Sequence, residues 1–166
     1  MLIKEIHSNS ILNKSGITDY CINPYMGCAF GCKYCYAQLI VRRFFHGKCA
    51  WGEFAFPKIN AAVVLEKQIK NAKKGSVFIS SITDAYQPLE QKYALTRKCL
   101  EVLLEYQFPI SILTKSPLVL RDIDLLKKFS DAEIGMTITT NDEKIRMMFE
   151  PKSPPTSARI ETLKKL

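Results

Sequence analysis

Short apolar segments rich in β-branched residues alternate with amphipathic segments along most of the chain, from about residue 61 onward. Three of the apolar segments have the length and composition of buried strands: Val77 to Ile82, Ser111 to Thr114 and Ile134 to Thr139. The segments between them repeat apolar residues with helical spacing. Parallel strands need helical crossovers, so this alternation predicts βαβ units and a parallel sheet, either open or curved into an arc of a barrel.

Start and stop signals predict the helices of these units. The first runs from Ala61 to Lys74 and ends before Gly75, and the second runs from near Pro88 to Tyr106 with Cys99 in its apolar face. A third begins with an N-cap and a first-turn proline at Ser116-Pro117. A fourth begins at 141–143 and stops before Pro151.

The last segment, Ser157 to Leu166, starts another amphipathic helix, and the chain stops without the strand into which such a helix should lead. We therefore expect an α/β fold of parallel strands with outer helices, a partial (β/α) barrel that is incomplete at its C-terminus. We expect one domain over residues 1–166, with a cysteine-rich loop at about 20–38 and βα units at about 61–166.

Composition restricts the environment of this domain. The N-terminus lacks the apolar segment of a signal peptide, and no apolar run approaches the roughly 20 residues of a membrane-spanning helix. A cytoplasmic protein, with no role in a membrane, is the expectation.

The net charge of +8 suits nucleic acid, anionic cofactors or acidic partners. Alternatively, lysine pairs at predicted helix ends only offset helix dipoles: Lys73 and Lys74, Lys127 and Lys128, and Lys164 and Lys165. His7 and His46 have no partners at a diagnostic spacing, and we expect both on the surface.

Three of the six cysteines, Cys28, Cys32 and Cys35, stand at C-x3-C-x2-C spacing in a loop with two glycines. Three thiolates on so short a loop can reach one metal centre, and glycines let backbone N–H groups approach a sulfide cluster. A structural zinc site and a fully protein-held four-iron cluster both require four ligands. Three cysteines therefore leave one iron open, and an open metal can bind a substrate or cofactor directly.

Other interpretations of the cysteines remain open. Cys21 or Cys49 would complete a zinc site with the triplet, and all of the thiols could be buried and inert. Cys21, Cys49 and Cys99 share no compact spacing with the triplet, so a structural role is the simpler expectation for them.

The triplet with an aromatic residue, Tyr34, before the last cysteine resembles the radical S-adenosylmethionine (SAM) superfamily. The wider segments DYCINPYMGCAFGCKYCYA, SSITDAYQPLE, LTKSP and EPKSPP resemble the branch related to spore photoproduct lyase, over about residues 19–166. The resemblance implies a four-iron four-sulfur (4Fe-4S) cluster that binds and reductively cleaves SAM. The resulting 5′-deoxyadenosyl radical abstracts hydrogen from a substrate. It also implies a low-potential electron donor of the flavodoxin or ferredoxin type.

Polar residues at the ends of the predicted parallel strands are expected on one rim of the sheet: Thr83 and Asp84, Lys115, and Thr137 to Thr140. Lys115 could bind the SAM carboxylate, the resemblance implies that Thr83 and Thr137 supply hydroxyls to SAM, and Tyr34 should lie beside the adenine. Lys115, Thr83 and Thr137 have ordinary alternatives: a solvated lysine, an N-cap threonine and a strand threonine.

Three further residues carry open questions. Asp84 could cap a turn, orient Lys115 or face the substrate, and Tyr86 could pack, touch substrate or relay a radical. Spore photoproduct lyases place a hydrogen-donating cysteine where this chain has Ser81, which disfavours the lyase reaction. The substrate is unassigned, with nucleic acid as one class. The competing hypothesis is a non-catalytic zinc- or nucleic-acid-binding module that uses the cysteine triplet.

Overall fold

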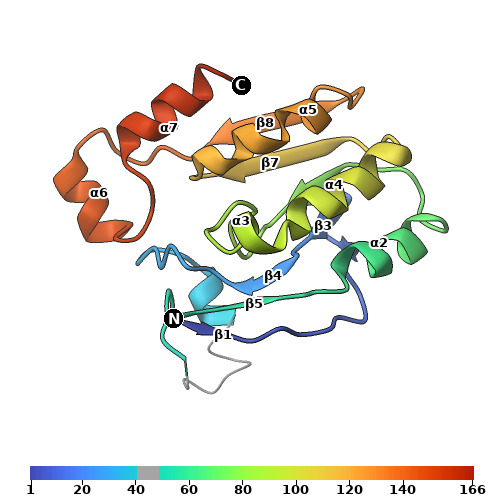
Figure 1. The fold of residues 1–166 in the computed structure, drawn as a ribbon, viewed down its shortest axis with the longest axis horizontal. Helices are drawn as coiled ribbons and strands as arrows, with labels where there is room; N and C mark the ends of the chain where they lie inside the picture. Colours follow the sequence, from blue (N-terminus) through green and yellow to red (C-terminus); the bar gives the residue numbers. More distant parts are fainter. Residues whose placement is uncertain (41–48) are drawn as a thin grey trace.

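A five-stranded, largely parallel sheet runs through the middle of the molecule (Figure 1). The computed structural model describes residues 1–40 and 49–166, so the expectation for His46 lies outside the described residues. The strands follow the order β2-β3-β6-β7-β8, and only β2 and β3 pair antiparallel. Their bounds are β2 Asn13–Lys14, β3 Tyr20–Ile22, β6 Val77–Ile79, β7 Ile110–Thr114 and β8 Ala132–Met136.

Amphipathic helices cover this sheet, and the main core lies between the two layers. Leu65 of α2 and Leu100 and Leu103 of α4 pack with Ile79 and Ile112 of the sheet, all of them buried. In Figure 1, α2, α4 and α5 lie over the same face of the sheet. The helices that lie wholly within the described residues are α2 Ala61–Ile69, α3 Glu90–Tyr93, α4 Leu95–Glu105, α5 Ile123–Leu126, α6 Glu143–Phe149 and α7 Thr156–Leu163, with a 3-10 helix at Pro117–Asp122.

Two predicted helices differ from the observed ones. Helix α2 ends at Ile69, five residues before the predicted end, and the Lys-Lys-Gly run follows it in irregular chain. The helix predicted from Pro88 to Tyr106 is divided at Ala94, whose φ of 49° is left-handed. The division is stabilised by Glu90, whose carboxylate accepts hydrogen bonds from the backbone N–H groups of Thr96 and Arg97 at the start of α4.

The predicted helix starts at Ser116 and at 141–143 are confirmed. The Ser116 hydroxyl accepts a hydrogen bond from the Leu118 N–H at 3.3 Å, although the segment that follows is a 3-10 helix. The Asp142 carboxylate accepts from Lys144 and Ile145 and caps α6. The three predicted strands are also present, with shorter or shifted bounds.

A second, small sheet that the sequence pattern did not predict lies beside the first, in the order β1-β5-β4. Its strands are β1 Leu2–Ile3, β5 Phe54–Pro57 and β4 Tyr25–Gly27. Strand β4 ends one residue before Cys28, so this sheet fixes the entry to the cysteine loop.

The fold is mixed α/β with an open parallel sheet and no closed barrel in the part of the chain that the structure describes, as the sequence predicts. Within that part, no helix has the length and apolar character needed to cross a membrane.

Candidate cofactor site

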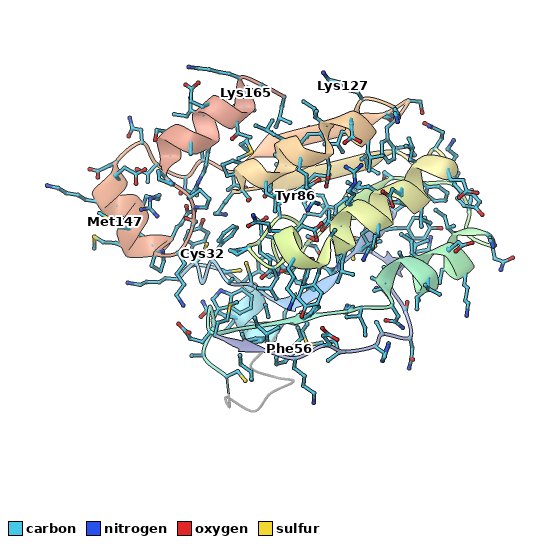
Figure 2. The ribbon with its side chains drawn as sticks, in the orientation of Figure 1. Cys32, Phe56, Tyr86, Lys127, Met147 and Lys165 are labelled. Carbon is cyan, nitrogen blue, oxygen red and sulfur yellow. The ribbon has the colours of Figure 1, made fainter. Side chains whose placement is uncertain are left out.

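A cavity of about 420 Å³ lies where the cysteine loop meets the residues that follow the parallel strands. Every site residue predicted from the sequence lines this cavity: Cys28, Cys32, Tyr34, Cys35, Thr83, Lys115 and Thr137. The carboxyl ends of parallel strands meet at one edge of a sheet, which explains how residues from β6, β7 and β8 reach the same space. In Figure 2, Cys32 lies on the α6 side of the central sheet, away from Lys127.

The cysteines approach the cavity from a tightly folded loop. Cys28 and Cys32 are buried and pack with Phe30, and Cys35 is half-buried. Gly27 and Gly31 have φ values of 82° and 62°, a conformation that favours glycine. A side chain at Gly27 would also collide with the backbone oxygen of Phe54, at 2.7 Å.

Burial favours the neutral thiols of Cys28 and Cys32. It raises the pKa of Cys28 to about 12, helped by the negative charge of Asp84, and it raises the pKa of Cys32 as well. Metal ligands must be thiolates, so metal binding here has to release protons.

The Thr83 hydroxyl is already used within the protein. It donates a hydrogen bond to the Gly27 carbonyl at 2.6 Å and accepts one from Gln87 Nε2 at 2.9 Å. Thr83 thereby ties the chain after β6 to the end of β4, directly before Cys28. Thr137, on the same cavity wall, continues the sheet, because its N–H donates to the Thr114 carbonyl at 2.8 Å.

Lys115 and Tyr34 share a buried partner, Glu150, that sequence reasoning missed. Lys115 Nζ lies 3.7 Å from Glu150 Oε1 and 5.8 Å from the centre of the Tyr34 ring. The Tyr34 hydroxyl donates to the same carboxylate oxygen, and Thr139 Oγ1 does so at 3.0 Å. Arg159 Nη2 holds the other oxygen at 2.6 Å. The motif EPKSPP begins at Glu150, so the signal was present but was used only as a mark of resemblance.

Asp84 and Tyr86, whose roles the sequence left open, are tied into the fold. The Asp84 carboxylate accepts from Thr114 Oγ1 at 2.6 Å and from the N–H groups of Lys115 and Tyr86, both at 2.9 Å. Burial raises the pKa of Asp84 although these bonds oppose the shift. Tyr86 is fully buried in the main core. Asp84 thus holds the backbone of Lys115 and also lines the cavity, and Tyr86 is packed in the main core.

The remaining cysteines lie outside the cavity wall. Cys21 accepts a weak hydrogen bond from Asn23 Nδ2 at 3.8 Å, Cys49 packs against the Phe54 and Phe56 cluster, and Cys99 is buried in the main core. In residues 1–40 and 49–166, no group of three or more His, Cys, Asp or Glu is placed to hold one metal ion. The structure therefore offers no preformed zinc site in the described residues.

The residues of the cavity fit an iron–sulfur cluster with an organic cofactor. The cysteines of a four-iron cluster bind different irons, so their thiols must surround a volume rather than converge on one point. The cavity also holds two buried polar atoms that have no hydrogen-bond partner among the described residues, Trp51 Nε1 and Ser80 Oγ. Buried polar groups are nearly always paired, so these atoms indicate a missing polar occupant.

Comparison with known proteins decides the family. The family model of the Radical SAM superfamily matches residues 22–166. The chain belongs to the radical SAM superfamily. An uncharacterized protein of Methanocaldococcus jannaschii is 44% identical over 89% of this chain and 54% of its own length. An uncharacterized protein of Acidianus two-tailed virus is 34% identical over 95% of this chain and 54% of its own length.

Solved structures agree on the fold of this radical SAM chain. A spore photoproduct lyase variant with bound AdoMet and dinucleoside spore photoproduct has a TM-score of 0.74, with 15% sequence identity. A second lyase variant has a TM-score of 0.75 with 16% identity. These matches cover 98% of this chain and 46% and 47% of the lyase chains. The radical SAM chain thus spans about half the length of the proteins it matches.

Proposed function

We propose that this protein is a radical SAM enzyme whose cluster is held by Cys28, Cys32 and Cys35. The observation that carries the proposal is the convergence of these three thiols, Tyr34 and Lys115 on one cavity. When bound there, the reduced cluster and SAM supply a 5′-deoxyadenosyl radical that abstracts hydrogen from a substrate. A flavodoxin or ferredoxin type of protein is the proposed electron donor, and the cytoplasm is the proposed compartment.

The residues of the chain have distinct parts in this proposal. Lys115 offers a positive charge to the SAM carboxylate, and its position is fixed by Asp84 at its backbone and by Glu150 at its ammonium group. Tyr34 presents its ring to the cavity, where an adenine can stack, and its hydroxyl is anchored on Glu150. Thr83 acts mainly through Gly27, because its proton is already donated to that carbonyl.

The test is anaerobic reconstitution followed by reduction in the presence of SAM. The expected results are iron with acid-labile sulfide and formation of 5′-deoxyadenosine. Cys32→Ala should lose both, whereas Cys99→Ala, a change at a buried thiol outside the cavity, should retain both. One tightly held zinc, no iron and no 5′-deoxyadenosine would instead support the zinc-binding module.

Nucleic acid is the proposed substrate class, and the support for it comes from the comparisons. The lyase variant contains a dinucleoside spore photoproduct, and a radical SAM Nα-GlyT isomerase of a Pseudomonas phage is 28% identical over 73% of this chain and 25% of its own length. The charge of +8 adds little support, because the pairs at 73–74 and 127–128 precede β6 and β8, at the sheet edge opposite the cavity. Ser81, which stands where spore photoproduct lyases have a hydrogen-donating cysteine, lies on the cavity wall. This difference disfavours the lyase reaction for this chain.

A further inference from the structure

The turn that carries Trp51 is fixed to the cysteine loop through the main chain. Gly52 and Gly31 have φ values of 86° and 62°. A Cβ atom on Gly52 would lie 2.7 Å from the Cα of Gly31, and one on Gly31 would lie 2.9 Å from the Cα of Gly52. This close approach requires glycine at both positions. The backbone next to Trp51 is therefore in contact with the residue that precedes Cys32.

The indole ring of Trp51 fills the space between the cysteines and the small sheet. It packs against the cluster of Cys28, Phe30 and Cys32. It also meets Phe54 edge to face, with ring centroids 6.2 Å apart and an interplanar angle of 76°. Trp51 also lines the cavity. Its ring is thus held at the cavity wall that the cysteine thiols share.

The Trp51 indole nitrogen has no hydrogen-bond partner in the part of the chain that the structure describes, although the atom is shielded from solvent. An indole N–H can only donate, so an acceptor must come from outside the side chains and backbone around it. The surroundings on the cysteine side are thiols and aromatic carbon, and the space beside them is the cavity. Sulfur is the acceptor that such a site would contain once a cluster is assembled.

We propose that Trp51 Nε1 donates a hydrogen bond to a sulfur of the iron–sulfur cluster and raises the reduction potential of that cluster. This inference rests on the proposed function. Reduction adds negative charge to the cluster, so a donor at a sulfur stabilises the reduced state more than the oxidised one, and hydrogen bonds to the sulfurs are among the factors that set cluster potentials. Trp51 is therefore a tuning residue that acts through the cofactor.

The first experiment compares cluster potentials in the reconstituted protein and in Trp51→Phe, which keeps an aromatic ring and removes the N–H. A redox titration followed by electron paramagnetic resonance should show a more negative potential in Trp51→Phe. A tenfold lower equilibrium constant for reduction corresponds to about 59 mV for a one-electron couple, and we expect a shift of up to that size. Phe56→Leu, in the same aromatic cluster but without a donor, is the packing control and should leave the potential in place.

The second experiment does not need the variant to fold. The chain has one tryptophan, so labelling its indole with 15N marks a single atom. The reduced cluster should show a 15N hyperfine coupling to this atom in pulsed electron paramagnetic resonance. A cluster that assembles without this coupling, or whose potential is equal in both proteins, overturns the inference and leaves the proposed function standing. Failure of the protein to assemble any iron–sulfide cluster overturns both.

Discussion

Glu150, directly after α6, interacts with two residues of the cavity wall, Tyr34 and Lys115. Glu150 is buried. One carboxylate oxygen accepts hydrogen bonds from Tyr34 and Thr139 and lies near the ammonium group of Lys115, and the other oxygen pairs with the buried Arg159. Arg159 also donates to the Thr137 carbonyl at 3.0 Å. A single carboxylate thus joins the end of α6, α7, the residues that follow β7 and β8, and the cysteine loop.

We predict a large loss of stability for Glu150→Ala. Removing the carboxylate leaves Arg159 and Lys115 as uncompensated cations, a change that costs about 3–5 kcal/mol when a buried pair is broken. Equilibrium unfolding in urea measures the difference. Glu161→Ala, which breaks an exposed pair with Lys164, is the matched control and should leave the unfolding free energy nearly unchanged. Equal losses of unfolding free energy in the two variants would contradict the inference that Glu150 compensates buried cations.

The same carboxylate makes stability depend on pH. Burial pushes the pKa of Glu150 upward, but hydrogen bonds from Tyr34 and Arg159 and the charges of Lys115 and Arg159 hold it below its usual value of 4.5. A lowered folded-state pKa contributes stability that is present above the unfolded value and is lost as the pH falls through the folded value.

We therefore predict that the difference in unfolding free energy between the protein and Glu150→Gln is largest near pH 7 and constant down to about pH 5. It should shrink as the pH falls below 4.5. Urea unfolding at a series of pH values from 7 to 3 checks this. A difference that stays constant down to pH 3 would show that the folded-state pKa of Glu150 is not lowered.

Single residues also show why sequence reasoning found part of the site. Cys28, Cys32 and Cys35 were predictable because their spacing restricts them to one small volume, and Lys115 because it follows a strand directly. Glu150 and Trp51 were not predictable, because both act through tertiary contacts. Glu150 contacts Tyr34, which lies 116 residues away in the sequence, and Trp51 packs against the cysteine loop. Apart from the family resemblance of the EPKSPP segment, nothing in the local sequence of Glu150 distinguishes a buried carboxylate with several partners from a solvated helix end.

At the scale of elements, the break between α3 and α4 is the clearest case in which tertiary contacts override propensity. The segment from Pro88 to Tyr106 contains no internal glycine or proline, so its periodicity predicts one helix. Glu90 supplies the alternative, because it accepts hydrogen bonds from the N–H groups of Thr96 and Arg97 and is itself held by Arg121 Nη2 at 2.7 Å. The cost of a left-handed Ala94 is offset by these bonds.

We predict that Ala94→Gly stabilises the protein by up to about 1 kcal/mol. Left-handed alanine costs about 1–2 kcal/mol, and this relief exceeds the roughly 0.5–1 kcal/mol of extra backbone entropy that glycine brings to the unfolded chain. Ala158→Gly, inside α7, is the control with the opposite sign and should destabilise by about 0.5–1 kcal/mol. Thermal or urea unfolding of both variants measures the two changes in unfolding free energy. Destabilisation in both would mean that the strain at Ala94 is negligible.

The small sheet shows a second limit of pattern reading. Strands β1, β4 and β5 have two, three and four residues, too few to show an alternation of buried and exposed positions. Strand β5 even ends in Pro57, which is typical of an edge or a strand end. Only the pairing of β5 with both neighbours makes these segments strands.

At the scale of the whole molecule, the cavity joins parts of the chain that otherwise belong to separate layers. Its wall combines the cysteine loop, the turn at Trp51 next to the small sheet, and the residues after β6, β7 and β8 in the large sheet. A cofactor that contacts all three parts stabilises the folded state by mass action, since the unfolded chain does not assemble the site. Stability of the whole fold should therefore report on occupancy of the cavity.

We predict that the reconstituted protein melts about 5–10 °C above the iron-free protein. Binding at about 100 times the dissociation constant contributes about 2.7 kcal/mol, and 1 kcal/mol shifts the melting temperature of a chain of this size by about 2–4 °C. Removal of iron with a chelator should reverse the shift. Because the buried Cys28 thiol has its pKa raised to about 12, cluster assembly must also displace protons, so the shift should decrease as the pH is lowered.

Two cysteine variants separate this effect from general loss of packing. Cys32→Ala should melt at the same temperature with and without iron, because the cluster loses a ligand. Cys99→Ala, which removes a buried thiol from the main core, should melt lower than the parent protein in both states and still show the full iron-dependent shift. An iron-dependent shift that survives in Cys32→Ala would place the metal outside the cavity that the three cysteines line. An equal shift with zinc in the parent protein would support the zinc-binding module instead.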